Sequence, residues 1–175
     1  MDYSSILESV RAGNTEDYKE IILHFQSGVI RYLYRMTGDR DVACDLAQDT
    51  FIQAYRGVLK TVEIKNLKAW LYRIATNNSL QYIRRRKIIS FVSFESAGRE
   101  TKPGEDKTEE IAVREALKKI PEKQRTCLVL HFIEGFKYRE IAETLGTTEE
   151  AVRKQVARGK AVFRKAYEGD NENGL

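Results

Sequence analysis

The sequence contains few of the residues that cross-link a chain or interrupt its helices. Its 175 residues include two cysteines and two prolines. Cys44 and Cys127 lie far apart, and neither belongs to a CxxC motif, which argues against a disulfide or a zinc site. We therefore expect both cysteines to be buried and reduced. The scarcity of proline and of alternating polar and apolar runs predicts an all-helical protein.

Long apolar runs are also missing. No stretch approaches ~18 consecutive apolar residues, and residues 1–13 lack a basic start followed by an apolar segment, so neither a membrane span nor a signal peptide is predicted. We expect a cytoplasmic protein. Charged residues make up 32% of the chain, but the net charge is only +4. Binding to a polyanion would therefore depend on cations that cluster locally.

Candidate catalytic groups are scarce as well. Neither His24 nor His131 has a carboxylate or a cysteine at the spacing of metal ligands. Asp45 and Asp49 lie one helical turn apart, but a nucleic-acid enzyme would need a further ligand or a basic partner, and the sequence places none. We expect no enzyme activity, no metal, no cofactor and no small-molecule substrate.

The most informative stretch is residues 138–165. Apolar residues at helical spacing predict one helix before Gly146 and a second, basic helix after it. Gly146 can adopt the positive φ required just past a helix, and Thr148 can cap the second helix. Ala142 is small enough for the two helices to cross closely. This pattern is typical of a helix-turn-helix, which places its second helix in the major groove of DNA.

The side of the second helix opposite its apolar stripe is mostly cationic. It carries Glu150, Lys154, Ala157, Arg158, Ala161 and Lys165, flanked by Arg153 and Arg164. Long cations can reach phosphates or guanine edges, and a carboxylate can accept a hydrogen bond from cytosine. The alternative is a solvated cationic helix in an ordinary bundle, and DNA binding is the interpretation that we favour.

Residues 39–61, wound as a helix, have two unlike sides. Small and apolar residues gather on one side, and the other carries Asp41, Asp45, Gln48, Asp49, Ile52 and Arg56. An apolar residue ringed by polar ones suits a contact with another protein. A plain acidic surface explains the same pattern, and the spacing alone leaves both interpretations open.

Residues 60–87 form the most basic region, with eight cations and one acid. The sequence predicts a loop over residues 59–66 and a long helix from Leu67, with Trp70 in the core. One face of that helix mixes cations, an amide and an apolar residue: Arg73, Asn77, Leu80, Arg84 and Lys87. Such a face could bind the successive phosphates of a nucleic-acid strand and accept unstacked bases. We prefer this interpretation to the alternative that the cations at residues 84–87 only terminate a helix.

Residues 90–108 lose the helical periodicity and contain Gly98, Pro103 and Gly104, which predicts a linker. The expected fold is all-α, with two small helical domains joined by a flexible linker. We place the N-terminal domain at residues 1–92, the linker at 93–108 and the helix-turn-helix domain at 109–170.

Three stretches together resemble the bacterial extracytoplasmic-function sigma factors. They are DLAQDTF (45–51), AWLYRIATNNSLQYIRRRK (69–87) and residues 120–167. Members of that family are two-domain, all-helical subunits that join core RNA polymerase and direct it to promoters. The resemblance covers nearly the whole chain in order, with the linker in the expected place.

The resemblance implies a role for each surface. The clamp helices of the largest polymerase subunit would bind Asp45, Gln48, Asp49 and Ile52. The non-template strand of the start-proximal promoter element would contact Lys60, Lys65, Arg73, Asn77, Gln81 and Arg84, and the loop over residues 59–66 would receive a flipped base. The helix-turn-helix would read the start-distal element as duplex DNA through Thr148, Glu150, Arg153, Lys154, Ala157 and Arg158.

Some positions depart from the family pattern. Gln81 stands where many members have Asp or Asn, and Glu149 and Glu150 stand where small or hydroxyl residues are common. The promoter sequence therefore cannot be transferred from the family. The implied partners are core RNA polymerase, promoter DNA and an anti-sigma factor. The competing interpretation is a helix-turn-helix regulator that acts without being a polymerase subunit, which leaves the acidic surface and the basic helix without roles.

Overall fold

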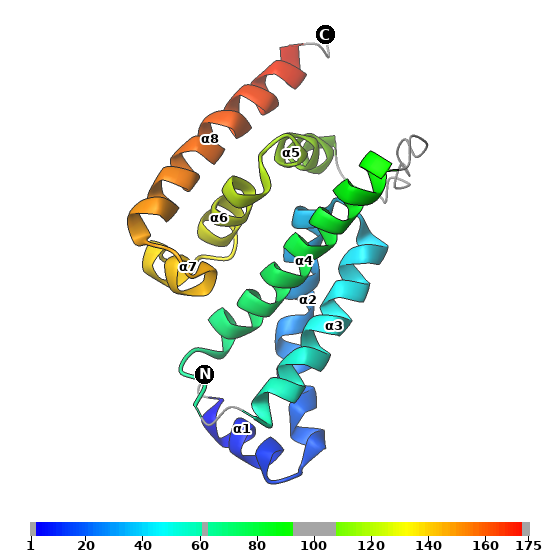
Figure 1. Cartoon of the computed structure of the whole chain (residues 1–175), viewed down its shortest axis with the longest axis vertical. Helices are drawn as coiled ribbons and strands as arrows, with labels where there is room; N and C mark the ends of the chain where they lie inside the picture. The colour runs from blue at the N-terminus through cyan, green and yellow to red at the C-terminus, as the bar shows by residue number, and fades with distance from the viewer. Residues whose placement is uncertain (1–2, 61–62, 93–107, 173–175) are drawn as a thin grey trace.

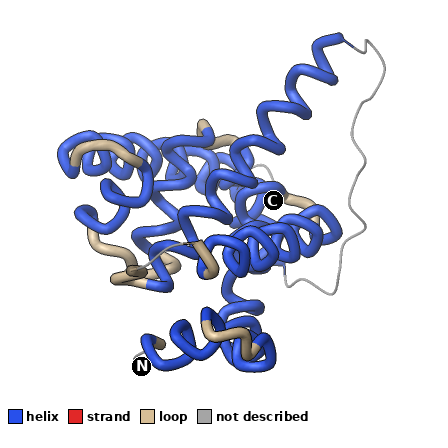
Figure 2. The backbone as a smooth tube through the Cα atoms, turned by 60° about the horizontal axis from the view of Figure 1, so that its bottom comes forward, coloured by secondary structure: helices blue, strands red, loops and turns tan. Residues whose placement is uncertain are grey.

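The computed structural model describes residues 3–60, 63–92 and 108–172, and all the regular structure in these ranges is helical (Figures 1 and 2). The prediction of an all-α protein is confirmed. The elements are α1 (Ser4–Arg11), a short 3-10 helix (Thr15–Asp17), α2 (Tyr18–Thr37), α3 (Arg40–Val58), α4 (Leu67–Val92), α5 (Thr108–Lys118), α6 (Glu122–Phe132), α7 (Tyr138–Leu145) and α8 (Glu149–Glu172). The predicted linker, residues 93–108, lies outside the described residues except for Thr108, which begins α5.

In the N-terminal domain, α2, α3 and α4 lie side by side and α1 packs at one end of them (Figure 1). The centre of this domain is built from large side chains that are shielded completely from solvent, among them Ile21, Tyr32, Leu33 and Leu71. A Cβ atom at Gly28 would lie 3.0 Å from the hydroxyl of Tyr72. The absence of a side chain at that position therefore lets α2 and α4 approach closely.

Side-chain caps begin the three helices that carry the predicted functional surfaces. Asp39 Oδ1 accepts hydrogen bonds from the backbone N–H groups of residues 41 and 42 at 3.0 and 3.1 Å, before α3. Asn66 Oδ1 accepts from the N–H of residue 69 at 3.0 Å, before α4, and Thr148 Oγ1 accepts from residue 151 at 3.2 Å, before α8. Each such cap stabilises a helix by about 1 kcal/mol. Gly146 has the positive φ, 62°, that the sequence predicts.

In the C-terminal domain, α6 is the central helix. Its residues 125–130 are all buried, because α8 covers one side of it and α2 of the N-terminal domain covers another. A Cβ atom at Gly159 of α8 would lie 3.2 Å from the carbonyl oxygen of Gln124. Glycine at this position lets α8 pack tightly on α6. The helices α7 and α8 form the predicted helix-turn-helix.

The two domains pack against each other along a seam, which extends one hydrophobic core across both of them. At one end of the seam, the Tyr72 hydroxyl donates a 2.6 Å hydrogen bond to the carboxylate of Glu134. The Lys68 ammonium donates to the Glu134 carbonyl oxygen at 2.6 Å and lies 4.7 Å from the centre of the Phe136 ring. The Tyr72 and Phe136 rings are 5.2 Å apart.

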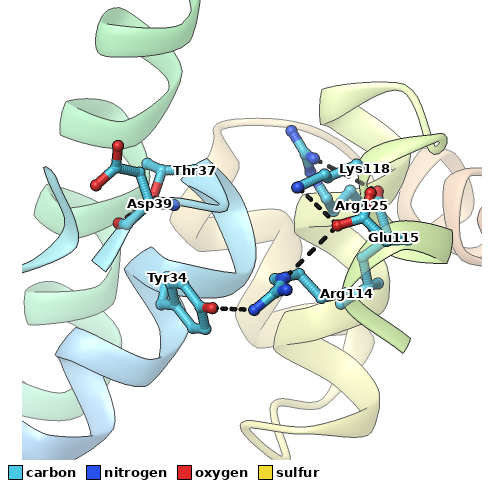
Figure 3. Close-up of polar contacts among 8 residues, drawn as sticks. Tyr34, Thr37, Asp39, Arg114, Glu115, Lys118 and Arg125 are labelled. Carbon is cyan, nitrogen blue, oxygen red and sulfur yellow. Dashed lines mark hydrogen bonds and ion pairs between the residues drawn. The ribbon is translucent and has the colours of Figure 1, made fainter. Parts of the chain in front are cut away.

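The other end of the seam joins α2 to α5 (Figure 3). The Arg114 guanidinium of α5 donates a hydrogen bond to the Tyr34 hydroxyl of α2. Gly38 ends α2, and a Cβ atom there would lie 2.8 Å from Cε of Lys118. Farther along α4, Lys87 forms an ion pair with Glu122 of α6. The C-terminal domain therefore contacts α4 near both of its ends.

Candidate protein and nucleic-acid interfaces

The outer side of α3 is exposed, as the sequence predicts. The residues Asp45, Gln48, Asp49 and Ile52, which we name the α3 ridge, are all exposed, and Ile52 keeps 41% of its surface in solvent. A groove of about 540 Å³ between α2 and α3 borders the ridge, lined by Tyr18, Ile22, Gln26, Ile30, Cys44, Ala47, Gln48, Phe51, Ile52 and Tyr55. An exposed isoleucine beside a mainly apolar groove, flanked by carboxylates, is typical of a surface that binds another protein.

The two cysteines differ in their environments. Cys127 is buried in α6, and burial raises the pKa of its thiol to about 11. Cys44 is exposed at the groove beside the α3 ridge, so the expectation that it is buried is wrong. The reason is its place on the helix, because the small residues at positions 43 and 47 face the core and turn position 44 outward.

Polar side chains hold α3 on α4 beneath the ridge. The buried Thr50 donates to the carbonyl oxygen of Leu46 at 2.7 Å and accepts from Nδ2 of Asn78 at 3.1 Å. Oδ1 of Asn78 in turn accepts from Nε2 of Gln53 at 3.2 Å. These bonds position the α3 ridge relative to the basic helix, because they join the two helices side by side.

The basic face of α4 lies outside the seam. Its residues Arg73, Asn77, Gln81 and Arg84 are all exposed. Neither arginine has an ion-pair partner among the residues that the structure describes. Lys60 and Lys65, on the loop before α4, are exposed as well. Four exposed cations with two amides between them form a surface that can bind the phosphates and bases of a nucleic-acid strand.

The inner side of α4 is rigidly packed. The Tyr32 hydroxyl is 2.7 Å from Thr76 Oγ1 and is fully buried, and this burial raises the pKa of Tyr32 well above its ordinary value. Burial and the hydrogen bond to Glu134 raise the pKa of Tyr72 in the same way. Both phenols therefore stay protonated at physiological pH. Trp70 packs against the core, and a Cβ atom at Gly57 would lie 2.6 Å from its ring.

Two cations near the start of the recognition helix α8 are paired with acids. All six residues expected to contact duplex DNA are exposed. Glu149 Oε1 lies 2.7 Å from Nη2 of Arg153, and Glu150 Oε1 lies 2.6 Å from Nζ of Lys154. The contact with Glu149 raises the pKa of Arg153 further. The two acids that depart from the family pattern thus stabilise the first turn of α8 and hold cations one turn later.

The seam is the feature that the sequence did not predict. It uses Lys68 and Lys87, two of the eight cations of the basic region, to bind the C-terminal domain. Glu122 on α6 binds Lys87, and Glu134 in the turn after α6 binds Lys68 and Tyr72. Neither acid carries a signal in the sequence, because isolated acids are common. Among the described residues no group of His, Cys, Asp and Glu could hold a metal ion, and no helix is long and apolar enough to span a membrane.

Known protein families match both domains. The family model of Sigma-70 region 2 matches residues 21–88, and that of Sigma-70, region 4 matches residues 110–162. The ECF RNA polymerase sigma factor SigW of Bacillus subtilis is 29% identical over 91% of this chain and 93% of its own. The ECF RNA polymerase sigma factor SigE of Mycolicibacterium smegmatis is 32% identical over 84% of this chain, which covers 60% of that longer protein.

Solved structures share the fold. The sigma factor RpoE in complex with the anti-sigma factor NepR from Bartonella quintana aligns over 87% of this chain and 98% of its own, with 22% identity and a TM-score of 0.74. CnrH in complex with the cytosolic domain of CnrY aligns over 94% of this chain and 96% of its own, with 21% identity and a TM-score of 0.74. At this level of identity, the likeness shows the fold alone.

Proposed function

The chain belongs to the extracytoplasmic-function group of the sigma-70 family. We propose that three separate surfaces of the chain bind polymerase, the separated promoter strand and duplex promoter DNA. As a sigma factor, it binds core RNA polymerase and directs transcription initiation at specific promoters. The family consists of DNA-binding subunits that are not enzymes. We further propose that this chain acts in the cytoplasm, where the polymerase is, without a catalytic activity, metal or cofactor of its own.

The first surface is the α3 ridge, which would bind the clamp helices of the largest polymerase subunit. The exposure of Ile52 between polar residues, beside an apolar groove, supports this assignment. Replacing Ile52 with Glu should weaken binding to core polymerase by about 2 kcal/mol or more if Ile52 is a hot spot of the interface. The matched control is Leu23→Glu, because Leu23 is 77% exposed on α2 and does not line the groove. Equal losses in the two variants would count against the assignment.

The second surface is the basic face of α4, which would hold the separated non-template strand. Opening a promoter costs a few kcal/mol for each base that leaves the stack. Arg73 and Arg84 are exposed and unpaired within the described residues, so they can bind phosphates without first breaking an ion pair. Asn77 and Gln81 lie between them and can donate to or accept from base edges. We propose that Lys60 and Lys65 extend the same track.

The third surface is the recognition helix, which would read the start-distal element as an intact duplex. Thr148, Glu150, Arg153, Lys154, Ala157 and Arg158 are exposed on α8 or at its start. Arg158→Ala should weaken recognition by about 1–3 kcal/mol on the correct sequence if its guanidinium makes a bidentate base contact. Equal weakening on every sequence would reassign Arg158 to a phosphate contact.

An anti-sigma factor is the proposed regulatory partner. The related fold of RpoE was solved with its anti-sigma factor NepR, which supports such a partner for this chain. The α3 ridge and the adjoining groove are the surfaces that such a partner would cover, because occupying them would block polymerase. The Ile52→Glu variant should then lose binding to both partners, whereas a partner that binds elsewhere would tolerate it.

Run-off transcription with purified core polymerase tests the whole proposal. Adding the chain should allow initiation at its promoters, and core polymerase without the chain should fail to select them. The free chain should bind promoter DNA weakly, because its net charge is only +4 and acids pair with two of the cations of α8. Sequence-specific nanomolar binding by the free chain at physiological salt, without an effect on initiation, would instead support a helix-turn-helix regulator that acts without polymerase.

A further inference from the structure

Arg153 is held from two sides, which distinguishes it from the other cations of the recognition helix. Within α8, its Nη2 donates to Oε1 of Glu149 at 2.7 Å. From α7, the ring of Tyr138 lies beneath it, with 5.5 Å between the guanidinium carbon and the ring centre. An arginine that is bonded to a carboxylate and lies over an aromatic ring has fewer accessible rotamers than one with a single partner, although the Arg153 side chain is still 63% exposed.

Tyr138 is itself positioned by the turn between α6 and α7. Its ring lies 4.3 Å from that of His131, centre to centre, at an interplanar angle of 33°. Nδ1 of His131 is 2.9 Å from the carbonyl oxygen of Phe136, whose side chain is buried in the core. A column of side chains, which we name the Arg153 column, therefore runs from this turn through His131 and Tyr138 to Arg153 and ends at Glu149.

The neighbouring cations lack this support. Lys154 pairs with Glu150 alone, and both of these side chains are largely exposed. An ion pair of this kind in solvent holds a flexible lysine only weakly. Arg158 is exposed and has no ion-pair partner among the described residues. Among these three cations, Arg153 is the one whose guanidinium contacts both a carboxylate and an aromatic ring within the described residues.

We infer that Arg153 is a specificity-determining residue of the recognition helix, and that Tyr138 and Glu149 are positioning residues that aim it at a guanine of the start-distal element. The inference rests on the proposed DNA-reading role of α8. One of the five N–H groups of the guanidinium is engaged by Glu149, which leaves enough for bidentate donation to O6 and N7 of guanine. The Glu149 carboxylate also offsets the charge of Arg153 and so weakens its attraction to phosphates, which favours an uncharged base edge.

Promoter discrimination by the holoenzyme tests the inference. Each base pair of the start-distal element is replaced in turn, and binding to each template is measured. Arg153→Ala should reduce discrimination at one G·C pair by about 10- to 100-fold and leave the other positions nearly unchanged. Tyr138→Ala and Glu149→Gln should reduce discrimination at that same pair by a smaller factor. Tyr138→Phe should preserve discrimination, because it keeps the ring that supports the guanidinium.

The double variant Tyr138→Ala with Arg153→Ala separates positioning from direct contact. If Tyr138 acts through Arg153, the double variant is no worse at that base pair than Arg153→Ala alone. Additive losses would mean that Tyr138 contacts DNA itself and would overturn its positioning role. Unfolding midpoints of all the variants, measured alongside, show whether a loss of discrimination comes from a loss of folded protein.

The Lys154–Glu150 pair supplies the matched control. Lys154→Ala and Glu150→Gln should change binding by a similar factor on every template, because neither side chain belongs to the Arg153 column. The inference fails if Lys154→Ala, and not Arg153→Ala, abolishes the discrimination between base pairs at a G·C position. If the wild-type holoenzyme ignores all substitutions in the start-distal element, the proposed role of α8 fails instead. If it responds to them but Arg153→Ala has no effect, only this inference fails.

Discussion

The two basic helices of this protein are built differently. The exposed face of α4 carries Arg73 and Arg84 without acidic partners among the described residues, whereas α8 pairs Arg153 and Lys154 with acids one turn earlier. Unpaired cations attract any polyanion at a distance and do not require a particular orientation. Paired cations attract a polyanion less strongly, and Arg153, which also lies over the Tyr138 ring, is the better oriented of the two. The difference suits a flexible single strand on α4 and an intact groove on α8.

The surroundings of the two helices explain why each can be built as it is. Packing holds α4 along its length, because α2 and α3 cover one side and the C-terminal domain contacts it near both ends. Its exposed face therefore needs no ion pairs for its stability. Only one side of α8 is covered, by α5, α6 and α7, and the two acids of its first turn, Glu149 and Glu150, are exposed. There, acids in the first turn stabilise the helix through its dipole and through pairs with residues four positions later.

The largest expected effect comes from disrupting the seam between the domain that contains α4 and the domain that contains α8. Phe136 is 4% exposed and packs against Tyr72 and Lys68, so Phe136→Ala should lower the free energy of unfolding by about 3–5 kcal/mol in urea denaturation. Phe132→Ala is the control, since Phe132 is 57% exposed, and it should change the value by less than about 0.5 kcal/mol. Similar values for the two variants would argue against the seam.

The next effect contrasts the single cysteine of each domain. In the native protein at pH 8, an alkylating reagent followed by mass spectrometry should label the exposed Cys44 and leave Cys127 unmodified. Because burial raises the pKa of Cys127 from 9.0 to about 11, the folded state favours the neutral thiol. Its contribution to stability should therefore be complete below pH 9 and should fall as pH rises from 9 towards 11. Rapid labelling of Cys127 without denaturant would contradict the packing of α6.

A smaller effect compares the charges of the two helices. In the holoenzyme, Arg73→Ala with Arg84→Ala should reduce the slope of log affinity against log salt by about 1.4, the sum of two single-strand phosphate contacts. Lys154→Ala should change the slope by less than about 0.9, the value for one unpaired duplex contact, because Glu150 already neutralises part of its charge. A full change of about 0.9 for Lys154→Ala would show that pairing with Glu150 does not weaken its contact with DNA.

The smallest expected effect tests whether the Glu150–Lys154 ion pair weakens or strengthens binding to DNA. Glu150→Gln removes a negative charge from a surface that faces DNA, and it also releases Lys154. Binding to all promoters should tighten slightly, by about 0.2–0.5 kcal/mol, the range of an exposed helical ion pair. Weaker binding on one promoter class would show instead that Glu150 accepts a hydrogen bond from a base.

Much of the fold could be predicted from the sequence because helices depend on neighbours in the chain. Stripes of apolar residues predict both the helices and the sides that they bury, so the α3 ridge, the polar residues of the α4 face and the cationic face of α8 were assigned correctly to the surface, whereas Leu80 of the predicted α4 face packs against the core. Local signals also predict helix ends, as Gly146 and Thr148 illustrate. The orientation of Cys44 was missed, since a single position at the edge of a stripe can lie on either side of it.

The amino-acid order was thus sufficient for the helices, their exposed faces and the resemblance to a family, because each depends on residues within a few turns of one another. It could not specify the seam, where Tyr72 meets Glu134 across 62 positions in the chain. Nor could it specify the Arg153 column, where side chains from α6, α7 and α8 stack. Such contacts depend on the angles and distances at which packed helices meet, and side-chain packing across the whole molecule sets these.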